Sequence, residues 1–566
     1  MKKRISAILL SLLLLASSVG CAKTPTASNT PSSAASAASG ETNAPKEEYV
    51  VDYMQPEGDT LNSEDTPVGK ILKEKFNVSF HITSFTGDYE EQVALMLSGG
   101  NYPEIMRLRN GNDIQKYVKA GALVELESLA NQCGATDFLT FHKDSIPIWK
   151  LGSGNGKLYT WESNSPQIAL SSDVIVRSDV LEAAGYPDVL TEDEWINLLK
   201  IGMEKFPTVD GQPTVGMTFP GGESYGVEGI QPVMFEKGGY TDLAENGPVI
   251  YNNKEDKFED YFLNKYVKSS FRFFNRLYKE GLLDSECFSD LAQQTQEKVV
   301  SGRALSVFYV GWDAGTANQG FREAGKPEME YVWMPVMSQD QIDAGENRCF
   351  REMQSYIWDS YAITKNCKHP ERIMEVLNYA STEEGAVLLG SGIEGVHYTV
   401  DSDGKRQPTK DYISNCVSDG TYAYKQGIDS FLFLGSIGMP DASGQYYQMW
   451  RNESYKSALL SDRTKEVYSH YGWEGESDMW YKNDRFGITM VKSGVVNSQT
   501  LDPSSAEGKL AQQLIDYRNK AAVQLAMADD FEAAYAELVE GYKKLNPETV
   551  VDDINKMYEK NKAAIN

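Results

Sequence analysis

Apolar and polar residues alternate with two different periods in the part of the chain that precedes residue 130. Residues 48–54 and 78–83 are short stretches with alternating or β-branched apolar side chains, which predicts strands. Residues 66–76 and 89–98 have apolar side chains at steps of three and four, which predicts helices. A third strand is predicted at residues 103–108. Strands that alternate with helices are typical of layered sheets covered by helices, so the pattern predicts an α/β fold.

The same alternation returns in residues 354–398. Residues 355–364 are apolar, aromatic and partly β-branched, which predicts a buried strand. The polar residues 365–370 end in proline, which suits a turn and the first turn of a helix. Apolar side chains then fall at helical spacing over residues 371–380, and a second short helix is predicted at 382–389.

Aromatic and apolar side chains also mark elements in the rest of the chain. Residues 254–281 have an aromatic stripe at steps of three and four, which predicts a helix packed into a core rather than a ligand-binding face. Residues 302–312 are predicted to be a strand that ends in a Gly-Trp turn, and residues 509–527 and 530–546 are predicted helices. Trp450, Trp473 and Trp480 lie among Gly- and Asp-rich stretches, where aromatic side chains are plausible ligand contacts but more often structural.

The N-terminus has the pattern of an export signal. Three basic residues at positions 2–4 precede a short apolar stretch at 8–16 that is too short to span a bilayer. The sequence Ser-Val-Gly-Cys at positions 18–21 resembles a bacterial lipobox, although Ser18 stands where Leu is usual. The resemblance implies cleavage after residue 20 and lipidation of Cys21, and a plain secretory signal remains the alternative.

Residues 22–46 contain Ala, Ser, Thr, Pro, Asn and Gly with almost no large apolar side chain. Such a segment buries too little surface to offset its ordering entropy, so we expect a flexible tether. A lipid anchor, a tether and a globular body together predict a protein held on the extracellular face of the cell membrane.

Composition narrows the function classes. A chain of 566 residues is long enough for two domains. Its formal charge of −27 argues against nucleic acid as a partner, because phosphates are bound by Lys and Arg. The 32 Tyr, 21 Phe and 9 Trp include enough aromatic faces to bind flat apolar ligand surfaces such as sugar rings.

No motif indicates a metal, a cofactor or a catalytic centre. The five cysteines after Cys21 are irregularly spaced without CxxC, so free thiols are expected, with one disulfide possible. The five histidines show no metal-site spacing, and no phosphate-binding or nucleophile-elbow motif occurs. Residues 401–405 (DSDGK) favour a hairpin turn over a calcium loop. Arg177 and Asp179 are interpreted as a strand end and a helix start rather than a catalytic pair.

Several stretches resemble the extracellular solute-binding proteins of carbohydrate ABC transporters, in particular their lipoprotein branch. The resemblance is carried by AIT at 362–364, HPE at 369–371, EG at 384–385, GIEGVHY at 392–398 and DGK at 403–405. SGGNYPEI at 98–105, GALVELESLA at 121–130 and the capping-box segment around Thr191 and Glu194 add to it. It extends over most of the chain after Tyr49 and is weak over 205–290 and 410–566.

The resemblance implies a two-lobed periplasmic-binding-protein-like fold of type II, with a hinge and a cleft between the lobes. The implied division is a signal peptide at 1–20, the lipidated Cys21 and tether at 21–46, one lobe at 47–165 plus 352–395, and the other at 166–351 plus 396–566. A chain that crosses three times between lobes makes a stiff hinge, which permits rigid-body closure.

The function implied by the resemblance is capture of a sugar or oligosaccharide and its delivery to ABC permease subunits, by a monomer without cofactor, metal or catalysis. Two alternatives stay open: a receptor for a peptide or another non-sugar solute, and a secreted polysaccharide-degrading enzyme whose carboxylate pair is hidden among the 81 acidic residues. The expected ligand contacts are Trp161, Glu162, Trp312, Asp313, Glu394 and His397.

Overall fold

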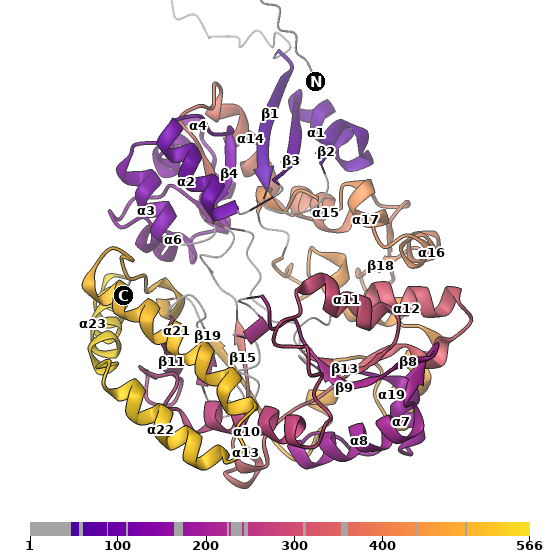
Figure 1. Cartoon of the computed structure of the whole chain (residues 1–566). Helices are drawn as coiled ribbons and strands as arrows, with labels where there is room; N and C mark the ends of the chain where they lie inside the picture. Colours follow the sequence, from indigo (N-terminus) through magenta and orange to yellow (C-terminus); the bar gives the residue numbers. More distant parts are fainter. Residues whose placement is uncertain are drawn as a thin grey trace, which may run out of the picture. The chain divides into compact units, whose positions relative to one another are not determined.

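The computed structural model separates the chain into residues 1–46 and a body that begins at Glu47. All elements described below belong to the body (Figure 1). The residues that the structure describes are 47–55, 60–85, 87, 89–108, 111–162, 174–223, 226–227, 240–242, 247–308, 313–352, 360–428, 430–435, 438–492 and 495–565.

The first sheet has six strands in the order β2-β3-β1-β4-β16-β5. Strand β1 is parallel to β3 and β4, whereas β16 is antiparallel to both β4 and β5. The strands expected near residues 50, 80, 105 and 360 are therefore confirmed and lie in one sheet. Their bounds are β1 Tyr49–Gln55, β2 Leu61–Asn62, β3 Val78–Ser84, β4 Ile105–Leu108, β5 Trp161–Glu162 and β16 Ser360–Ile363.

Helices cover both faces of the first sheet. Alternate residues of β4 show this division, since Ile105 packs into one cluster with α1, α4 and α14, and Met106 into another with α2 and α3. Helix α14 begins at Pro370, where proline suits the first turn, as the sequence predicted. The bounds are α1 Pro67–Phe76, α2 Tyr89–Gly99, α3 Gly111–Lys119, α4 Leu126–Cys133, α5 Thr136–Phe141, α6 Ile146–Gly152, α14 Pro370–Ala380 and α15 Glu383–Ser391.

The first core extends further along the chain than the expected boundary at residue 395. Side chains between residues 398 and 455, including Tyr412, Phe431 and Tyr455, pack into the same cluster as β1 and β3. The physical reason is burial: Phe431 and Phe433 lie against Phe80, with ring centroids 6.4 and 5.1 Å apart. The elements of this segment are β17 Tyr398–Val400, β18 Arg406–Pro408, α16 Lys410–Ser418, α17 Tyr422–Gln426, η6 Leu432–Leu434, η7 Met449–Arg451 and α18 Glu453–Leu459.

The turn at residues 401–405 joins β17 and β18 as a hairpin. The backbone N–H groups of Asp403 and Lys405 both donate to Oδ1 of Asp401, at 2.9 Å each. Gly404 supplies a positive φ of 78°. The hairpin prediction is confirmed. The carboxylate of Asp401 accepts hydrogen bonds from backbone N–H groups within the turn and so stabilises it.

The second sheet has four strands in the order β14-β6-β13-β9 and is also covered on both faces. Along β6, Val174 and Val176 pack with α7, α8 and α10, and Ile175 packs with α11 and α12. The predicted capping box of α8 is confirmed, since Glu194 accepts a hydrogen bond of 2.7 Å from Thr191 N. The bounds are β6 Val174–Arg177, β9 Val215–Thr218, β13 Ala304–Phe308, β14 Tyr331–Met334, α7 Ser178–Ala183, α8 Glu192–Lys205, α11 Ala292–Val300, α12 Asp313–Glu323 and α19 Asp462–His470.

A third core joins the three-stranded sheet β10-β11-β12 to the C-terminal helices α21, α22 and α23, which are yellow in Figure 1. The helix predicted over residues 254–281 begins only at Lys265, because residues 257–260 pair with β11 as strand β12 and Asn264 caps the helix. The aromatic stripe of α10 is divided between two cores, since Tyr266 and Phe271 enter this core while Phe274 enters the second. The bounds are β10 Tyr240–Asp242, β11 Val249–Asn252, β12 Lys257–Asp260, α10 Lys265–Lys279, α21 Ala506–Ala526, α22 Phe531–Lys543 and α23 Glu548–Ile565.

Short elements complete the described body. None of its described helices combines the length and the apolar character needed to cross a membrane. The five cysteines of the body are free thiols, of which Cys133 is exposed. The remaining elements are η1 Ser63–Asp65, β7 Thr208–Val209, β8 Gln212–Pro213, η4 Pro327–Met329, α13 Gln339–Asp343, β15 Arg348–Glu352, α20 Asp478–Tyr481, β19 Ile488–Lys492 and η8 Val495–Ser498.

Candidate functional site

Two of the expected ligand contacts form the edge strand β5 of the first sheet. The side chain of Trp161 is fully buried, and its Nε1 donates a hydrogen bond of 2.7 Å to the carbonyl oxygen of Phe433. Glu162 is also buried, and its Oε1 accepts a hydrogen bond of 2.8 Å from Ser360 Oγ on β16. Both side chains therefore stabilise the edge of the first sheet through buried hydrogen bonds.

The expected contacts Glu394 and His397 belong to the same turn but differ in solvent exposure. Glu394 is exposed, whereas His397 is buried. Nδ1 of His397 accepts a hydrogen bond of 2.9 Å from Ile393 N, and burial lowers the pKa of the imidazole. A Cβ at Gly392, where φ is +81°, would lie 2.4 Å from that nitrogen, so this glycine permits the turn to close over the ring.

Three further expectations fall where the structure gives no side-chain description. Trp312 and Cys21 lie outside the described residues, and Asp313 is described only as the first residue of α12. The hydrogen bonds of Trp161 and Glu162 lead to Phe433 and Ser360, whereas that of His397 Nδ1 leads to Ile393. The structure does not gather the described members of the expected set into one site.

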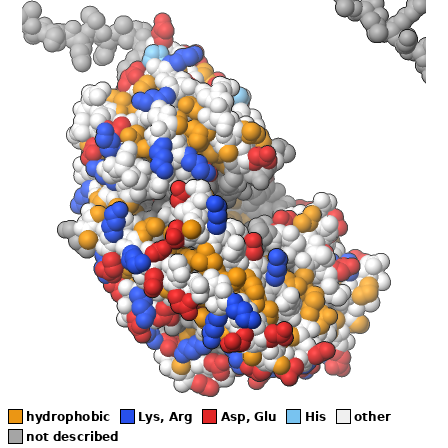
Figure 2. All heavy atoms as spheres, turned by 60° about the vertical axis from the view of Figure 1, so that its left-hand side comes forward, with side chains coloured by type: hydrophobic (Ala, Val, Ile, Leu, Met, Phe, Trp, Pro, Cys, Tyr) orange, Lys and Arg blue, Asp and Glu red, His pale blue; other side chains and the backbone are white. Residues whose placement is uncertain are grey.

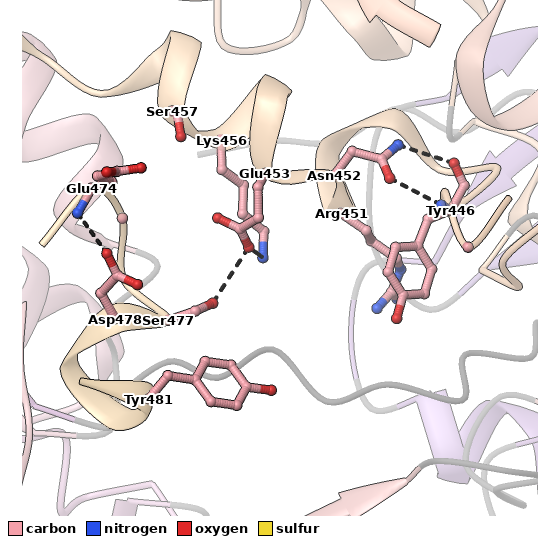
Figure 3. A pocket seen from close by; sticks show the side chains of 12 residues that line it. Tyr446, Arg451, Asn452, Glu453, Lys456, Ser457, Glu474, Ser477, Asp478 and Tyr481 are labelled. Atoms are coloured by element: carbon pink, nitrogen blue, oxygen red, sulfur yellow. Dashed lines mark hydrogen bonds and ion pairs between the residues drawn. The ribbon is translucent and has the colours of Figure 1, made fainter. Parts of the chain in front are cut away.

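A polar pocket of about 440 Å³ lies between α18 and α20 (Figure 3). Its α18 side belongs to the first core through Tyr455, and its α20 side packs through Met479 and Trp480 against Trp333 of the second sheet. The pocket is therefore lined by segments that are anchored on two different sheets. The lining residues are Gly444, Tyr446, Arg451, Asn452, Glu453, Lys456, Ser457, Glu474, Gly475, Ser477, Asp478 and Tyr481.

Hydrogen bonds to the backbone fix one wall of the pocket. Oδ1 of Asn452 accepts from Tyr446 N at 2.9 Å, and its Nδ2 donates to Tyr446 O at 3.0 Å. Beside it, Nε of Arg451 donates to Gln448 Oε1 at 2.6 Å, and the guanidinium lies 4.4 Å from the ring centroid of Trp450. These contacts set the positions of polar groups before any ligand arrives.

Carboxylates and cations are interspersed around the opposite wall. Oε1 of Glu453 accepts from Ser477 Oγ at 3.4 Å and lies 3.5 Å from Lys456 Nζ. Oδ2 of Asp478 accepts from Glu474 N at 2.7 Å. Figure 3 shows the side chains of Glu453 and Ser477 approaching each other from α18 and from the start of α20. The wall thus offers oxygen acceptors beside ammonium donors.

Glu476, a half-buried acid next to the pocket, has a raised pKa. Burial raises the pKa of Glu476 to about 7; the nearby Lys456 opposes the shift and Glu453 adds to it. Glu476 thus changes its charge near neutral pH, between Gly475 and Ser477 of the pocket lining.

Tyr481 gives the pocket an accessible aromatic face. Its side chain is 63% exposed and lies at the end of α20. An aromatic ring beside carboxylates, an amide and cations is typical of sites that stack on a sugar ring and hydrogen-bond its hydroxyl groups. The described side chains include no group of three or more His, Cys, Asp or Glu that could hold a metal ion.

Tryptophans of this region were candidate ligand contacts from the sequence, but the residues that line the pocket were not identified. Of the three tryptophans noted there, Trp480 is buried, Trp473 stacks on Tyr471 at 4.7 Å, and Trp450 is 38% exposed beneath Arg451. The exposed aromatic that lines the pocket is instead Tyr481. A tyrosine near glycine and aspartate was the available signal, but only packing shows which ring stays outside the core.

Comparison with known proteins gives a consistent family and fold. The model of the bacterial extracellular solute-binding protein family matches residues 77–387, more than half of the chain. Lipoprotein LipO of Bacillus subtilis (strain 168) is 22% identical over 484 residues, which are 84% of this chain and 85% of LipO.

Two solved structures are similar in fold. One is an HMO-binding, ABC-transporter-associated solute-binding protein from Bifidobacterium longum infantis, with a TM-score of 0.59 at 14% identity over 91% of this chain and 99% of its own. The other is the alginate-binding protein AlgQ2, with a TM-score of 0.57 at 15% identity over 91% and 98%. These similarities confirm the predicted α/β fold as that of periplasmic-type solute-binding proteins.

Proposed function

The chain belongs to the bacterial extracellular solute-binding proteins, and from this premise we propose that it captures an oligosaccharide outside the cell and delivers it to an ABC transporter permease. Membership of this family makes it a binding protein rather than an enzyme, which sets aside the polysaccharide-degrading alternative. The observation that carries the sugar assignment is the polar pocket with the exposed ring of Tyr481 at its side.

The pocket lining supports a hydroxyl-rich cargo. Carboxylates such as Glu453 and Asp478 accept hydrogen bonds from hydroxyl groups, and Lys456 and Arg451 donate to their oxygens. The ring of Tyr481 provides the apolar face on which a pyranose stacks. The two structural neighbours named above are described as HMO-binding and alginate-binding, which agrees with a glycan cargo.

Ligand-driven closure would couple capture to delivery. Segments lining the pocket are anchored on the first core and against the second sheet, so a ligand that contacts both walls would favour the arrangement in which all contacts form. We include Trp312 and Asp313 in the proposed contact set. Trp161, Glu162, Glu394 and His397 remain predictions, since none of them lines the pocket.

We also propose that lipidated Cys21 holds the protein at the extracellular face of the membrane through the 22–46 tether. Support comes from the lipobox-like sequence and from the similarity to lipoprotein LipO. The proposed protein acts as a monomer that meets the permease at the membrane surface.

A thermal-shift screen of residues 47–566 tests the cargo. A ligand that binds only the native state raises the melting temperature, so one glycan class is expected to raise it by several degrees. The panel should contain neutral oligosaccharides, alginate oligosaccharides and peptides. A shift with peptides and with no glycan would contradict the sugar assignment and favour the peptide receptor.

Substitution of Tyr481 tests the site. Tyr481→Ala removes the stacking face and is expected to weaken binding of the identified glycan about tenfold, equivalent to about 1.4 kcal/mol. Tyr278→Ala is the matched control, because Tyr278 is an exposed tyrosine on α10 that does not line the pocket. Equal affinities of the two variants, measured by calorimetry, would remove Tyr481 from the site.

A further inference from the structure

A second polar groove of about 620 Å³ lies at the end of the first sheet where β1 begins. It is formed by β1, by the turn before β4 and by the turn after β16. None of its residues lines the pocket at Tyr481. The lining residues are Tyr49, Val50, Asp52, Gly100, Asn101, Tyr102, Pro103, Glu104, Asn366, Lys368 and His369.

The carboxylate of Glu104 is held in place at the groove. Its Oε1 accepts from Tyr49 Oη at 2.5 Å and from Lys368 N at 3.4 Å, and its Oε2 accepts from Asp52 N at 3.2 Å. Burial raises the pKa of Tyr49, and the hydrogen bond to Glu104 adds to the rise, so the hydroxyl remains a donor. A carboxylate fixed by three donors is a pre-organised acceptor for ligand hydroxyl groups.

The turn before β4 is fixed as well. Nδ2 of Asn366 donates to Gly100 O at 3.3 Å and to Tyr102 O at 2.9 Å. Gly100 has a φ of +68°, and a Cβ there would meet no atom within 4 Å, so the backbone beside the groove is open to solvent. The half-buried ring of Tyr102 stands 5.7 Å from Tyr117, which limits its movement.

Aromatic and polar groups both line the groove. Tyr49, Tyr102 and His369 supply ring surfaces, and the ring of His369 lies 5.0 Å from that of Tyr49. Asp52 and Glu104 supply carboxylates, and the amides of Asn101 and Asn366 line the same space. Rings beside acceptors and amides are suited to sugar rings with their hydroxyl groups.

The groove lies at the end of the sheet opposite to the usual ligand site. In open α/β sheets, ligands bind beyond the carboxyl ends of the parallel strands. Tyr49 is the first residue of β1, residues 100–104 precede β4, and the antiparallel β16 ends here, since Ile363 pairs with Ile105. The groove therefore lies at the amino ends of the parallel strands, where this fold has no general reason to hold its cargo.

The same end receives the chain from the 22–46 segment. Nη1 of Arg372 donates to Glu47 O at 3.2 Å, its Nη2 donates to Phe76 O at 2.7 Å, and Tyr49 N donates to Asn77 O at 3.0 Å. These bonds fix the first residues of the body beside the groove.

We propose that this groove is a second saccharide-binding site, which holds a hydroxyl-rich glycan chain beside the point where residues 22–46 join the body. The glycan has two available sources, an oligosaccharide that the protein transports or a glycan of the cell envelope. The proposal does not rest on the cargo of the pocket at Tyr481. It assigns Glu104 and Asp52 as hydroxyl acceptors and Tyr102 as the stacking ring.

Binding measurements on residues 47–566 test the groove. This part of the chain includes every hydrophobic cluster of the described body. The probes are purified peptidoglycan sacculi in a sedimentation assay, and maltohexaose and an N-acetylglucosamine hexamer in titration calorimetry. Glu104→Gln keeps the shape and the Tyr49 contact but removes the charge. It is expected to weaken binding of at least one probe about tenfold, while Tyr278→Ala, at an exposed tyrosine that lines neither the groove nor the pocket, leaves that binding unchanged.

Asn101→Ala is the second variant, because Asn101 is exposed and its replacement does not threaten folding. Loss of binding to sacculi alone assigns the envelope glycan, and loss for a soluble hexamer assigns the transported one. Both results support the groove. It is overturned if no probe binds the Tyr481→Ala protein, or if Glu104→Gln and Asn101→Ala both bind like the unsubstituted chain. The sacculi assay does not require the cargo of the pocket to be known. A wrong prediction for the pocket and a wrong prediction for the groove therefore give separate results.

Discussion

At the scale of single residues, His142 shows how burial controls ionisation in this protein. Its side chain is buried among the rings of Phe138, Phe141 and Trp149, with centroids 5.1, 5.1 and 4.9 Å away. Burial lowers the pKa of the imidazole to about 3. The folded protein therefore keeps His142 neutral at pH values where the unfolded chain has already charged it.

This difference predicts acid sensitivity. An unfolded histidine titrates near 6.5, so the contribution of His142 is fully present above that pH and is lost as the pH falls toward 3. Between pH 6.5 and 4 the loss is about 3 kcal/mol in the free energy of unfolding. His142→Gln should flatten the dependence, measured by denaturant unfolding at each pH. The control Asn101→Ala, at an exposed side chain that does not titrate, should keep the original slope.

At the scale of elements, one buried cation ties helix α11 to the second sheet. Nζ of Lys298 lies 2.7 Å from Asp284 Oδ2 and 2.5 Å from Asp290 Oδ2, and all three side chains are buried. Thr218 on β9 donates to the same oxygen of Asp284 at 2.9 Å. The helix, the loop at 284–290 and the strand thus share one charge network.

Removal of the cation should destabilise this region strongly. Lys298→Met leaves two carboxylates buried without their partner, so we expect a loss of about 3–5 kcal/mol in the free energy of unfolding. Lys200→Met is the matched control, because Lys200 forms an exposed pair with Glu280 at 2.9 Å, for which we expect less than about 1 kcal/mol. Comparable losses in the two variants, by urea unfolding, would show that burial does not set the cost.

Local elements were predictable from the sequence, but their assembly was not. The hydrophobic periods placed β1, β3, β4, β16 and α14 correctly, because each period reflects local burial. The hairpin at 401–405 and the capping box of α8 followed from short-range hydrogen bonds. The packing of residues 398–455 onto the first core could not be predicted, because the periodicity of a segment does not show which surface it packs against.

The candidate sites show the same limit. Trp161 and His397 were sensible ligand candidates by residue type, yet both side chains are buried here. The pocket gathers residues 444–481 and the groove gathers residues 49–369, so both exist only after distant segments meet. A residue type suggests the chemistry, whereas tertiary packing decides which copy of that residue is accessible.

At the scale of the whole molecule, the net charge opposes self-association. The formal charge is −27. In the view of Figure 2, acidic and basic side chains are interspersed over the surface, with hydrophobic side chains between them. Such a surface opposes self-association through mutual repulsion. The membrane attachment proposed above would then be provided by the N-terminal segment.

Metabolic labelling with a fatty acid tests that attachment. The full-length protein should incorporate label and sediment with membranes, and Cys21→Ala should do neither, because its thiol is the acylation site. Cys133→Ala, at an exposed thiol of the body, should behave like the unsubstituted protein. Label that survives in Cys21→Ala would contradict the lipid anchor.

The first core is built from segments that are far apart in the sequence, so it can be completed only late in the synthesis of the chain. The bond from Trp161 to Phe433 spans 272 residues, and the one from Phe138 to Asn378 spans 240. At roughly 5–20 residues per second, the later partner leaves the ribosome on the order of tens of seconds after the earlier one. Until residues 360–363 have been synthesised, β4 has no β16 beside it, and an unpaired strand edge invites pairing with other chains. The first third of a nascent chain therefore presents an open strand edge that the chain itself closes only when residues 360–363 follow.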